Sequence, residues 1–238
     1  MWYNICVYLK IRRCFMRKGK LIVLDGLDGC GKSTQLDLAA SFLAESGLKC
    51  RAISFPNYET LSGQLVECYL KGIIPCEGRN GGYSASTLYA VDRYVSYVTD
   101  WKDFYESGGV IIAGRYTTSN AIYQLSKMPP REYGDYLNWL FDFEYNKLGL
   151  PEPDAVIFLD MPTEVSQKLL SARYNGDESK KDIHESNIEF LNKCRECALY
   201  CADIYSWIVV NCSENGLPLP IEDIYLKICE HLRTILNV

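Results

Sequence analysis

The sequence predicts an α/β fold: a three-layer sandwich whose central parallel sheet of about five strands carries helices on both faces. Two observations support this prediction. Short apolar runs alternate with longer stretches of helical periodicity, as in folds built from strand–helix–strand units. Directly after the first apolar run, residues 26–33 read GLDGCGKS, the G-x-x-x-x-G-K-S pattern of a phosphate-binding loop between a strand and a helix.

The strands are expected where the apolar runs are short and bounded by turn residues, since such runs are typical of buried parallel strands. These runs are residues 20–25, 50–55, 109–114, 155–160 and 207–211. Between the second and third runs, residues 64–72 and 84–107 have helical character, and Gly108 ends the longer of the two. Residues 129–154 hold another helix with a Pro-rich exit, and a further helix begins near Glu185.

The residue types of the phosphate-binding loop follow from its chemistry. Its glycines allow a tight turn and bring backbone N–H groups to phosphate oxygens, at the N-terminus of the helical run 34–45. Lys32 supplies a positive charge for the β- and γ-phosphates, and the Ser33 hydroxyl can join the coordination shell of Mg²⁺. The expected ATP-binding residues are Gly26, Leu27, Asp28, Gly29, Cys30, Gly31, Lys32, Ser33 and Thr34. The fold predicted is therefore that of the P-loop NTPases.

Composition limits the class of protein. With 238 residues, 48% of them hydrophobic, the chain is long enough for one large domain. A formal net charge of −5 argues against nucleic acid as a partner. No apolar run approaches the roughly 18–20 residues needed to span a bilayer, so no membrane is expected as a partner. Eleven cysteines beside a phosphate-binding loop favour free thiols in a reducing cytoplasm.

Two segments stand apart from this core. Residues 1–15 lack the apolar centre and cleavage site of a secretory signal, and Met16 lies just before the first predicted strand. We expect residues 1–15 to be an N-terminal appendage, with an upstream start codon as one origin, and residues 16–238 to form a single domain. Cysteines at 194, 197 and 201 share one side of a predicted helix, where packing is favoured over a metal site.

Several motifs together resemble the thymidylate kinase family of nucleoside monophosphate kinases. Besides the phosphate-binding loop, they are FPNY (55–58), STLYAVDRY (86–94), GRYTTSNAIYQ (114–124), PEPD (151–154), LDMP (159–162) and DIHE (182–185). The resemblance runs from about Lys20 to the last helix. It implies a homodimer that transfers the γ-phosphoryl group of ATP to dTMP in the presence of Mg²⁺, giving dTDP and ADP.

An acceptor monophosphate needs cationic groups, and guanidinium suits phosphate geometry. Arg93 and Arg115 both fall near the expected carboxyl edge of the sheet, although a structural salt bridge is the alternative for either, Arg93 above all because Asp92 is its neighbour. The resemblance implies that both contact the acceptor phosphate, that Tyr89 stacks on thymine, and that Tyr123 disfavours a ribose 2′-hydroxyl. The implied dTMP-binding residues are Phe55, Tyr58, Tyr89, Arg93, Arg115, Asn120, Tyr123 and Asp182.

The polar segment at about 173–185 is either a solvated connection or a lid that closes over phosphates. The resemblance implies a lid and places Asp28 beside the transferred phosphoryl group. Mg²⁺ is expected at Ser33, Asp28 and Glu185. The lid cations are Arg173, Lys180 and Lys181, and the implied catalytic residues are Lys32, Asp28, Arg115 and Arg173.

Two positions depart from the family pattern. Gly114 stands where family members commonly carry Asp, so a carboxylate near the acceptor phosphate is in question unless Asp25 or Asp160 reaches the same space. Gly29 stands where some members carry Arg inside the phosphate-binding loop. Two other functions remain open: a kinase for another deoxynucleotide or a deoxynucleoside, and a nucleotide-dependent switch that transfers to no small acceptor.

Overall fold

The computed structural model describes residues 19–78, 80–173 and 187–238. The expected appendage and all of the expected lid after Arg173 lie outside the described residues. The strands are β1 (Lys20–Gly26), β2 (Cys50–Ser54), β3 (Val110–Gly114), β4 (Ala155–Asp160), β5 (Ile208–Asn211), β6 (Ser213–Glu214) and β7 (Leu217–Pro218). The α-helices are α2 (Lys32–Glu45), α3 (Leu61–Leu70), α4 (Gly81–Ser96), α5 (Lys102–Glu106), α6 (Thr117–Leu125), α7 (Tyr133–Phe141), α8 (Thr163–Arg173), α9 (Ile188–Tyr205) and α10 (Ile221–Leu236).

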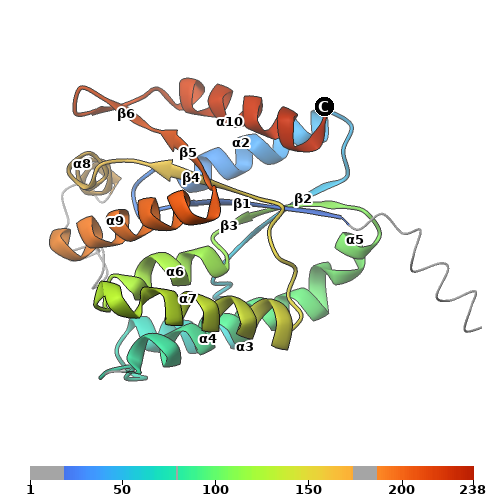
Figure 1. Cartoon of the computed structure of the whole chain (residues 1–238). Helices are drawn as coiled ribbons and strands as arrows, with labels where there is room; N and C mark the ends of the chain where they lie inside the picture. The colour runs from blue at the N-terminus through green and yellow to red at the C-terminus, as the bar shows by residue number, and fades with distance from the viewer. Residues whose placement is uncertain (1–18, 79, 174–186) are drawn as a thin grey trace, which may run out of the picture.

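The central sheet has five parallel strands in the order β2-β3-β1-β4-β5, which confirms the predicted fold class (Figure 1). Strands β6 and β7 form a separate antiparallel hairpin. Each predicted strand is present, with ends that differ by at most one residue. None of the helices in the described part of the chain combines the length and apolar character that crossing a bilayer requires.

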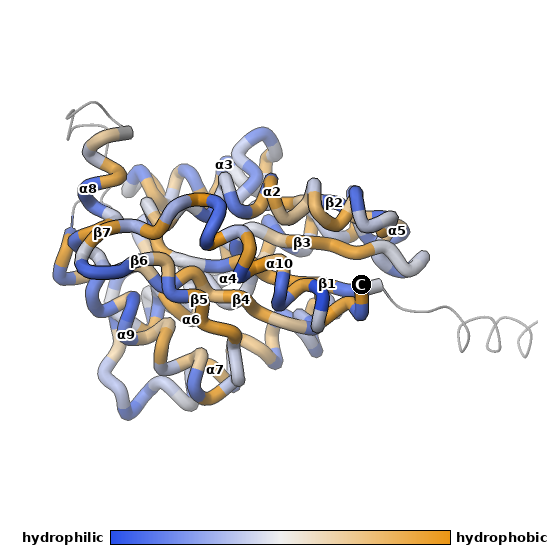
Figure 2. The backbone as a smooth tube through the Cα atoms, turned by 90° about the horizontal axis from the view of Figure 1, so that it is seen from above, coloured by the Kyte–Doolittle hydropathy of each residue, from blue (hydrophilic) through white to orange (hydrophobic). Residues whose placement is uncertain are grey.

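Helices cover both faces of the sheet, as Figure 1 shows. Because successive side chains of a strand point to opposite faces, Leu21 and Val23 of β1 enter one core while Ile22 and Leu24 enter the other. The first core lies against the aromatic-rich helices α6, α7 and α9, and the second lies against α2 and α10. Strands β3 and β4 accordingly run as hydrophobic stretches through the middle of the molecule (Figure 2).

Helix boundaries differ from the prediction where local capping or irregular turns intervene. The helix predicted at 64–72 begins at Leu61, because the side chain of Thr60 accepts a hydrogen bond from the backbone N–H of Gly63. The stretch predicted as one long helix at 84–107 is instead α4, a π-helical turn η1 (Tyr97–Trp101) and α5. Helix α7 likewise continues into a π-helical segment, η3 (Asp142–Lys147), and is preceded by a short 3₁₀ turn, η2 (Pro130–Glu132).

The strand register decides what lies at the carboxyl edge of the sheet. Strand β1 is central, and its Leu24 pairs with Gly114 of β3. The residues that follow these two strands, the phosphate-binding loop after β1 and Arg115 after β3, therefore emerge side by side. This edge is where open α/β sheets bind their ligands.

Candidate active site

The phosphate-binding loop connects β1 to α2 and is built for an anion. Gly29 and Gly31 have φ values of 79° and 83°, in the left-handed region that glycine adopts without strain. Helix α2 has no side-chain cap at its N-terminus and no acidic residue in its first turn. Its first N–H groups and its positive dipole end are therefore directed to whatever anion enters the loop.

Lys32 and Ser33 stand at the entrance of this loop. The Lys32 ammonium donates a hydrogen bond to the carbonyl oxygen of Gly26 at 3.0 Å, so the side chain folds back over the loop. Ser33 and Thr34 are exposed at the start of α2. A point charge above the loop and a hydroxyl at the helix start are the groups that P-loop proteins use for the β/γ-phosphates and for Mg²⁺.

Gly29 explains why this loop has no arginine. A Cβ atom at Gly29 would lie 2.7 Å from the carbonyl oxygen of Ser166 and 2.8 Å from Cγ of Leu170, both in α8. Its positive φ adds strain for any other side chain. The close approach of α8 therefore excludes a loop arginine here, and any further cation must come from elsewhere.

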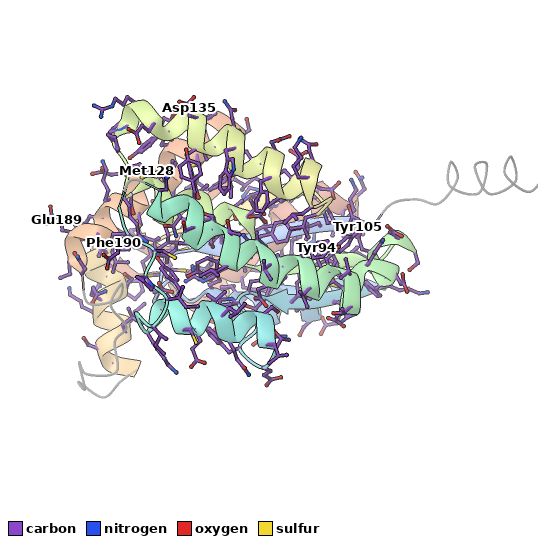
Figure 3. The ribbon with its side chains drawn as sticks, turned by 90° about the horizontal axis from the view of Figure 1, so that it is seen from below. Tyr94, Tyr105, Met128, Asp135, Glu189 and Phe190 are labelled. Carbon is purple, nitrogen blue, oxygen red and sulfur yellow. The ribbon has the colours of Figure 1, made fainter. Side chains whose placement is uncertain are left out.

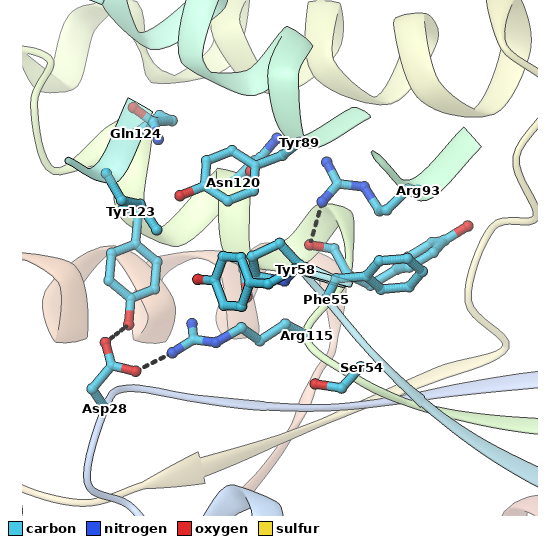
Figure 4. A pocket seen from close by; sticks show the side chains of 14 residues that line it. Asp28, Ser54, Phe55, Tyr58, Tyr89, Arg93, Arg115, Asn120, Tyr123 and Gln124 are labelled. Atoms are coloured by element: carbon cyan, nitrogen blue, oxygen red, sulfur yellow. Dashed lines mark hydrogen bonds and ion pairs between the residues drawn. The ribbon is translucent and has the colours of Figure 1, made fainter. Parts of the chain in front are cut away.

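Arg115 links the phosphate-binding loop to the acceptor side. Its guanidinium donates to the Asp28 carboxylate, which also accepts a hydrogen bond from the Tyr123 hydroxyl at 2.8 Å (Figure 4). The guanidinium lies over the Tyr123 ring at 5.2 Å from its centre. The backbone of Arg115 has φ 67°, a left-handed conformation that is uncommon for a residue with a side chain and is often found at functional sites.

The Asp28 carboxylate and the Arg115 guanidinium stay ionised over a wide pH range. Burial opposes ionisation of Asp28, but the charges of Arg115 and Lys32 and the Tyr123 hydrogen bond outweigh it, so the pKa of Asp28 lies below its ordinary 3.8. Burial likewise opposes the charge on Arg115, and the Asp28 carboxylate outweighs it and raises the pKa of the guanidinium. Asp28 and Arg115 therefore form a true ion pair at neutral pH.

We expect the Asp28→Asn variant to be less stable than the wild type by about 1 kcal/mol at pH 7, because one charge-assisted hydrogen bond is lost. A lowered folded-state pKa stabilises the protein above the unfolded pKa of about 3.9 and ceases to do so as pH falls through the folded value. The difference should thus persist from pH 7 to about 5 and shrink below about 4. Urea unfolding of both proteins across this range measures it.

Asp37→Asn is the matched control, because Asp37 is exposed on the same stretch of chain, in α2. Its substitution should change the free energy of unfolding by less than about 0.5 kcal/mol at every pH. A wild-type advantage over Asp28→Asn that disappears already between pH 7 and 5 would contradict the assigned pKa direction.

A cavity of about 320 Å³ opens beside Arg115. All seven described residues that the resemblance assigned to dTMP line it: Phe55, Tyr58, Tyr89, Arg93, Arg115, Asn120 and Tyr123 (Figure 4). Asp28 of the phosphate-binding loop lines it too, so one wall of the cavity is shared with the donor site. Asp182, the eighth expected residue, lies outside the described residues.

The wall opposite Arg115 is formed by α4 and α6. Tyr89 is held edge-on by Tyr69, with ring centres 6.1 Å apart, and burial raises the pKa of its hydroxyl, so Tyr89 is a neutral aromatic surface. The Asn120 amide donates to the Ser86 carbonyl oxygen at 3.3 Å. A flat ring and a fixed amide in one wall suit a planar, polar base.

Arg93 lines this cavity with its charge already compensated. Its Nε and one Nη donate to both oxygens of Glu144 at 2.7 and 2.6 Å, and the two side chains are almost fully buried. Burial alone would lower the pKa of Arg93, and the Glu144 carboxylate raises it. The salt-bridge alternative for Arg93 therefore holds, but the partner is Glu144 of η3. Asp92 instead accepts hydrogen bonds from Asn57 and Ser62.

The two carboxylates considered as replacements for one at position 114, those of Asp25 and Asp160, already have hydrogen-bond partners. Asp25 accepts hydrogen bonds from Thr118 and Ser119, and Asp160 forms a two-point ion pair with Arg195 at 2.6 and 2.8 Å. A Cβ at Gly114 would lie 2.9 Å from a methyl group of Leu36 and 3.3 Å from the Ser54 hydroxyl. Glycine at 114 thus matches a close approach of α2 and β2.

Of the expected lid, only Arg173 is placed, as the last residue of α8. Lys180, Lys181 and Glu185 lie outside the described residues. Further along, the three cysteines of α9 are buried in the core between α9 and its neighbours. Within the described ranges no three His, Cys, Asp or Glu residues are grouped to hold a metal, and the nine described cysteines are free thiols.

Sequence reasoning missed several residues of the site. Ser54, Leu70, Tyr116, Ser119 and Gln124 also line the cavity. Glu144 was missed as well, because it is 51 residues from Arg93 and enters the site only through the π-helical η3. The GRYTTSNAIYQ motif, which already contains three of these residues, was the signal that could have found Tyr116, Ser119 and Gln124.

The structure combines a glycine-rich anion loop and its overlying lysine with a parallel sheet of strand order 2-3-1-4-5. The loop faces a cavity lined by arginine side chains. These features define the class of P-loop kinases that act on nucleoside monophosphates. Comparison with known proteins agrees. The family model described as thymidylate kinase matches residues 24–219. The chain belongs to the thymidylate kinase family.

Individual relatives cover nearly the whole chain. A probable thymidylate kinase of Thermococcus gammatolerans is 31% identical over 88% of this chain and 94% of its own length. The thymidylate kinase of Plasmodium falciparum is 26% identical, with 92% of each chain covered. The solved structure of thymidylate kinase from Candida albicans superposes with a TM-score of 0.66 at 23% identity, covering 92% of this chain and 93% of that one, and supports the fold.

Proposed function

We propose that this chain transfers the γ-phosphoryl group of ATP to dTMP, giving ADP and dTDP. The observation that carries the proposal is the contact of Arg115 with Asp28, because it joins the acceptor cavity directly to the phosphate-binding loop. Phosphoryl transfer requires two nucleotides in line and compensation of their charge, with little covalent chemistry by the protein. A donor in the loop and an acceptor in the cavity would meet at this contact.

The cavity suggests how dTMP is oriented. Arg115 lies at the loop and is the group placed to hold the acceptor phosphate, while Tyr89 on the far wall stacks on the base. Arg93 is one helical turn from Tyr89 and neutralised by Glu144, so it suits the uncharged edge of the base better than the phosphate. The Tyr123 hydroxyl, fixed by Asp28, faces the sugar and opposes a 2′-hydroxyl.

Mg²⁺ fits the donor groups present. The exposed hydroxyl of Ser33 and the Asp28 carboxylate are hard oxygen ligands at the loop, and Glu185 would add a third. When bound, the ion compensates charge on the β- and γ-phosphates. Asp28 shares its carboxylate with Arg115, so an acceptor phosphate that engages Arg115 would release a carboxylate oxygen for the ion.

The test is an ADP-release assay with ATP and Mg²⁺ against dTMP, dUMP, dGMP, dCMP, UMP and thymidine. We expect turnover to be stimulated most by dTMP and much less by the ribonucleotide UMP. Turnover with another acceptor would retain the kinase mechanism and reassign the base. A rate of ADP release that none of the acceptors raises would overturn the proposal and favour a nucleotide-dependent switch.

We also propose that the lid supplies a cation during transfer, since α8 excludes an arginine from the loop. Among Arg173→Ala, Lys180→Ala and Lys181→Ala, at least one should lower kcat about 10- to 100-fold, as expected for loss of one charge that stabilises the transition state. Lys193→Ala is the control, because Lys193 pairs with Glu196 on the exposed surface of α9. An unchanged kcat in all three variants would refute this role.

The exposed apolar side chains of α3 and α4 support a homodimer. Val91 and Tyr94 on α4 and Val98 on the following η1 recur at helical spacing. Leu61 and Leu65 lie one turn apart on α3, which packs beside α4. Figure 3 shows Tyr94 on the outward side of α4. A face of this kind is self-complementary in a two-fold dimer, and we propose that a second copy of the chain covers it.

Sedimentation measures this assembly. The wild type should sediment at twice the 27.1 kDa chain mass, and a Val91→Glu/Tyr94→Glu variant at the chain mass, because two buried charges oppose association. Ile204→Glu introduces a charge at a somewhat more exposed apolar position on α9 and should leave the dimer intact. A monomeric wild type would exclude the proposed assembly.

The described free thiols fit a reducing cytoplasm as the compartment.

A further inference from the structure

A second cavity, of about 260 Å³, adjoins the phosphate-binding loop. The loop contributes Gly29 and Gly31 to its lining, and apolar side chains such as Met161, Leu170 and Ile224 contribute most of the rest. Such a cavity, apolar and contiguous with the anion site, suits a flat base attached to phosphates held in the loop. This step rests on the proposed function, in which ATP is the donor.

Gln35 is the polar side chain of this cavity whose hydrogen bonding is incomplete. It is 2% exposed, and its amide nitrogen donates to the carbonyl oxygen of Ile221 at 2.9 Å. Its Oε1 is buried and has no hydrogen-bond partner in the described part of the chain. Turning the amide over would place Oε1 against the Ile221 carbonyl, two acceptors facing each other, so the orientation of Gln35 is fixed.

A buried acceptor without a donor costs free energy, and a ligand that supplies the donor recovers it. Trp101 Nε1 and Thr163 Oγ1 are also unpartnered, but neither residue lines the cavity beside the loop. Gln35 is therefore the place where an incoming base can satisfy an orphaned group of the protein.

We propose that Gln35 is a specificity residue for the donor: its Oε1 accepts a hydrogen bond from the exocyclic amine of adenine. Guanine carries a carbonyl oxygen at the equivalent ring position and would place an acceptor against an acceptor. The apolar remainder of the cavity holds the base without distinguishing one purine from another, so this one oxygen decides the preference.

Isothermal calorimetry with ATP and with purine riboside 5′-triphosphate, which lacks only the amine, tests the proposal without any acceptor. The wild type should bind ATP about 3- to 10-fold more tightly, the effect of one neutral hydrogen bond. Equal affinities in the wild type would overturn the proposal. Because dTMP is absent, this outcome is independent of the acceptor assay, so failure of the proposed function and failure of this inference are distinguishable.

Two variants show which side chain produces the preference for ATP over purine riboside 5′-triphosphate. Gln35→Leu, checked for folding by circular dichroism, should bind both triphosphates equally, because the acceptor oxygen is gone. Leu169→Ala removes apolar contact from the same cavity at a half-exposed position and should weaken both triphosphates by the same factor, leaving the preference intact. A Gln35→Leu protein that keeps the full preference for ATP would assign the selection to another group. If Gln35→Leu does not fold, equal affinities of the wild type for the two triphosphates would still overturn the proposal.

Discussion

Replacing Arg115 by alanine is expected to lower kcat/KM for dTMP by about 100- to 1,000-fold, the loss typical of removing one partner of a desolvated charged contact. Arg115 is the cation that the chain directs to both the cavity and the loop, and its charge is held in place by Asp28 and Tyr123. The same substitution leaves the Asp28 carboxylate without its partner. Initial rates of ADP release at varied dTMP concentration measure the effect.

Three further variants distinguish the possible causes of this loss of kcat/KM. Arg115→Lys keeps the charge without the planar fork and should recover only part of the loss. Arg115→Ala/Asp28→Asn removes the unpaired carboxylate as well and should not restore the use of dTMP. Arg51→Ala breaks an exposed pair with Asp100 far from the cavity and should leave kcat/KM within about 2-fold. A loss below about 3-fold in Arg115→Ala would remove Arg115 from the acceptor site.

The fold was predictable because its signals are local. A buried strand is recognised from its own apolar run, and the loop from spacing within eight residues. The irregular turns were not predictable from such patterns. Residues 84–107 keep helical periodicity throughout, yet the hydrogen bonding changes at η1, where Tyr97 and Trp101 pack against each other in the core. Tertiary packing, which the local pattern does not contain, decides that turn.

The sequence predicted part of the cavity lining but not the side-chain pairings. The seven described residues that the motif resemblance assigned to dTMP line one cavity, whereas four other lining residues were missed: Ser54, Leu70, Tyr116 and Ser119. The resemblance did not identify that Asp28 is bound by Arg115, 87 residues away, or that Glu144 neutralises Arg93. These pairings depend on strand register and on η3. They bear on the proposed chemistry, because from them we infer that Arg115 holds the acceptor phosphate and that Arg93 contacts an uncharged group.

The largest effect on stability is expected from Glu144→Ala, which leaves the buried Arg93 guanidinium without its carboxylate. Breaking such a pair costs about 3–5 kcal/mol, because an uncompensated charge remains in a medium of low polarity. Thr117 loses its acceptor as well, since its hydroxyl donates to Glu144 at 2.7 Å. For a domain of this size the midpoint of thermal unfolding should fall by roughly 6–20 °C. Scanning calorimetry and urea unfolding measure the loss.

The control is Lys147→Ala, because Lys147 forms an exposed pair with Asp142 within the same η3 segment and should contribute no more than about 0.5 kcal/mol. An Arg93→Met/Glu144→Leu protein should recover most of the stability, since apolar side chains of similar volume replace buried pairs at little cost. It should not recover turnover with dTMP, because the hydrogen-bond donors that Arg93 presents to the acceptor are gone. Recovery of both properties would make the pair purely structural, whereas recovery of stability alone shows that the charge is buried here for recognition.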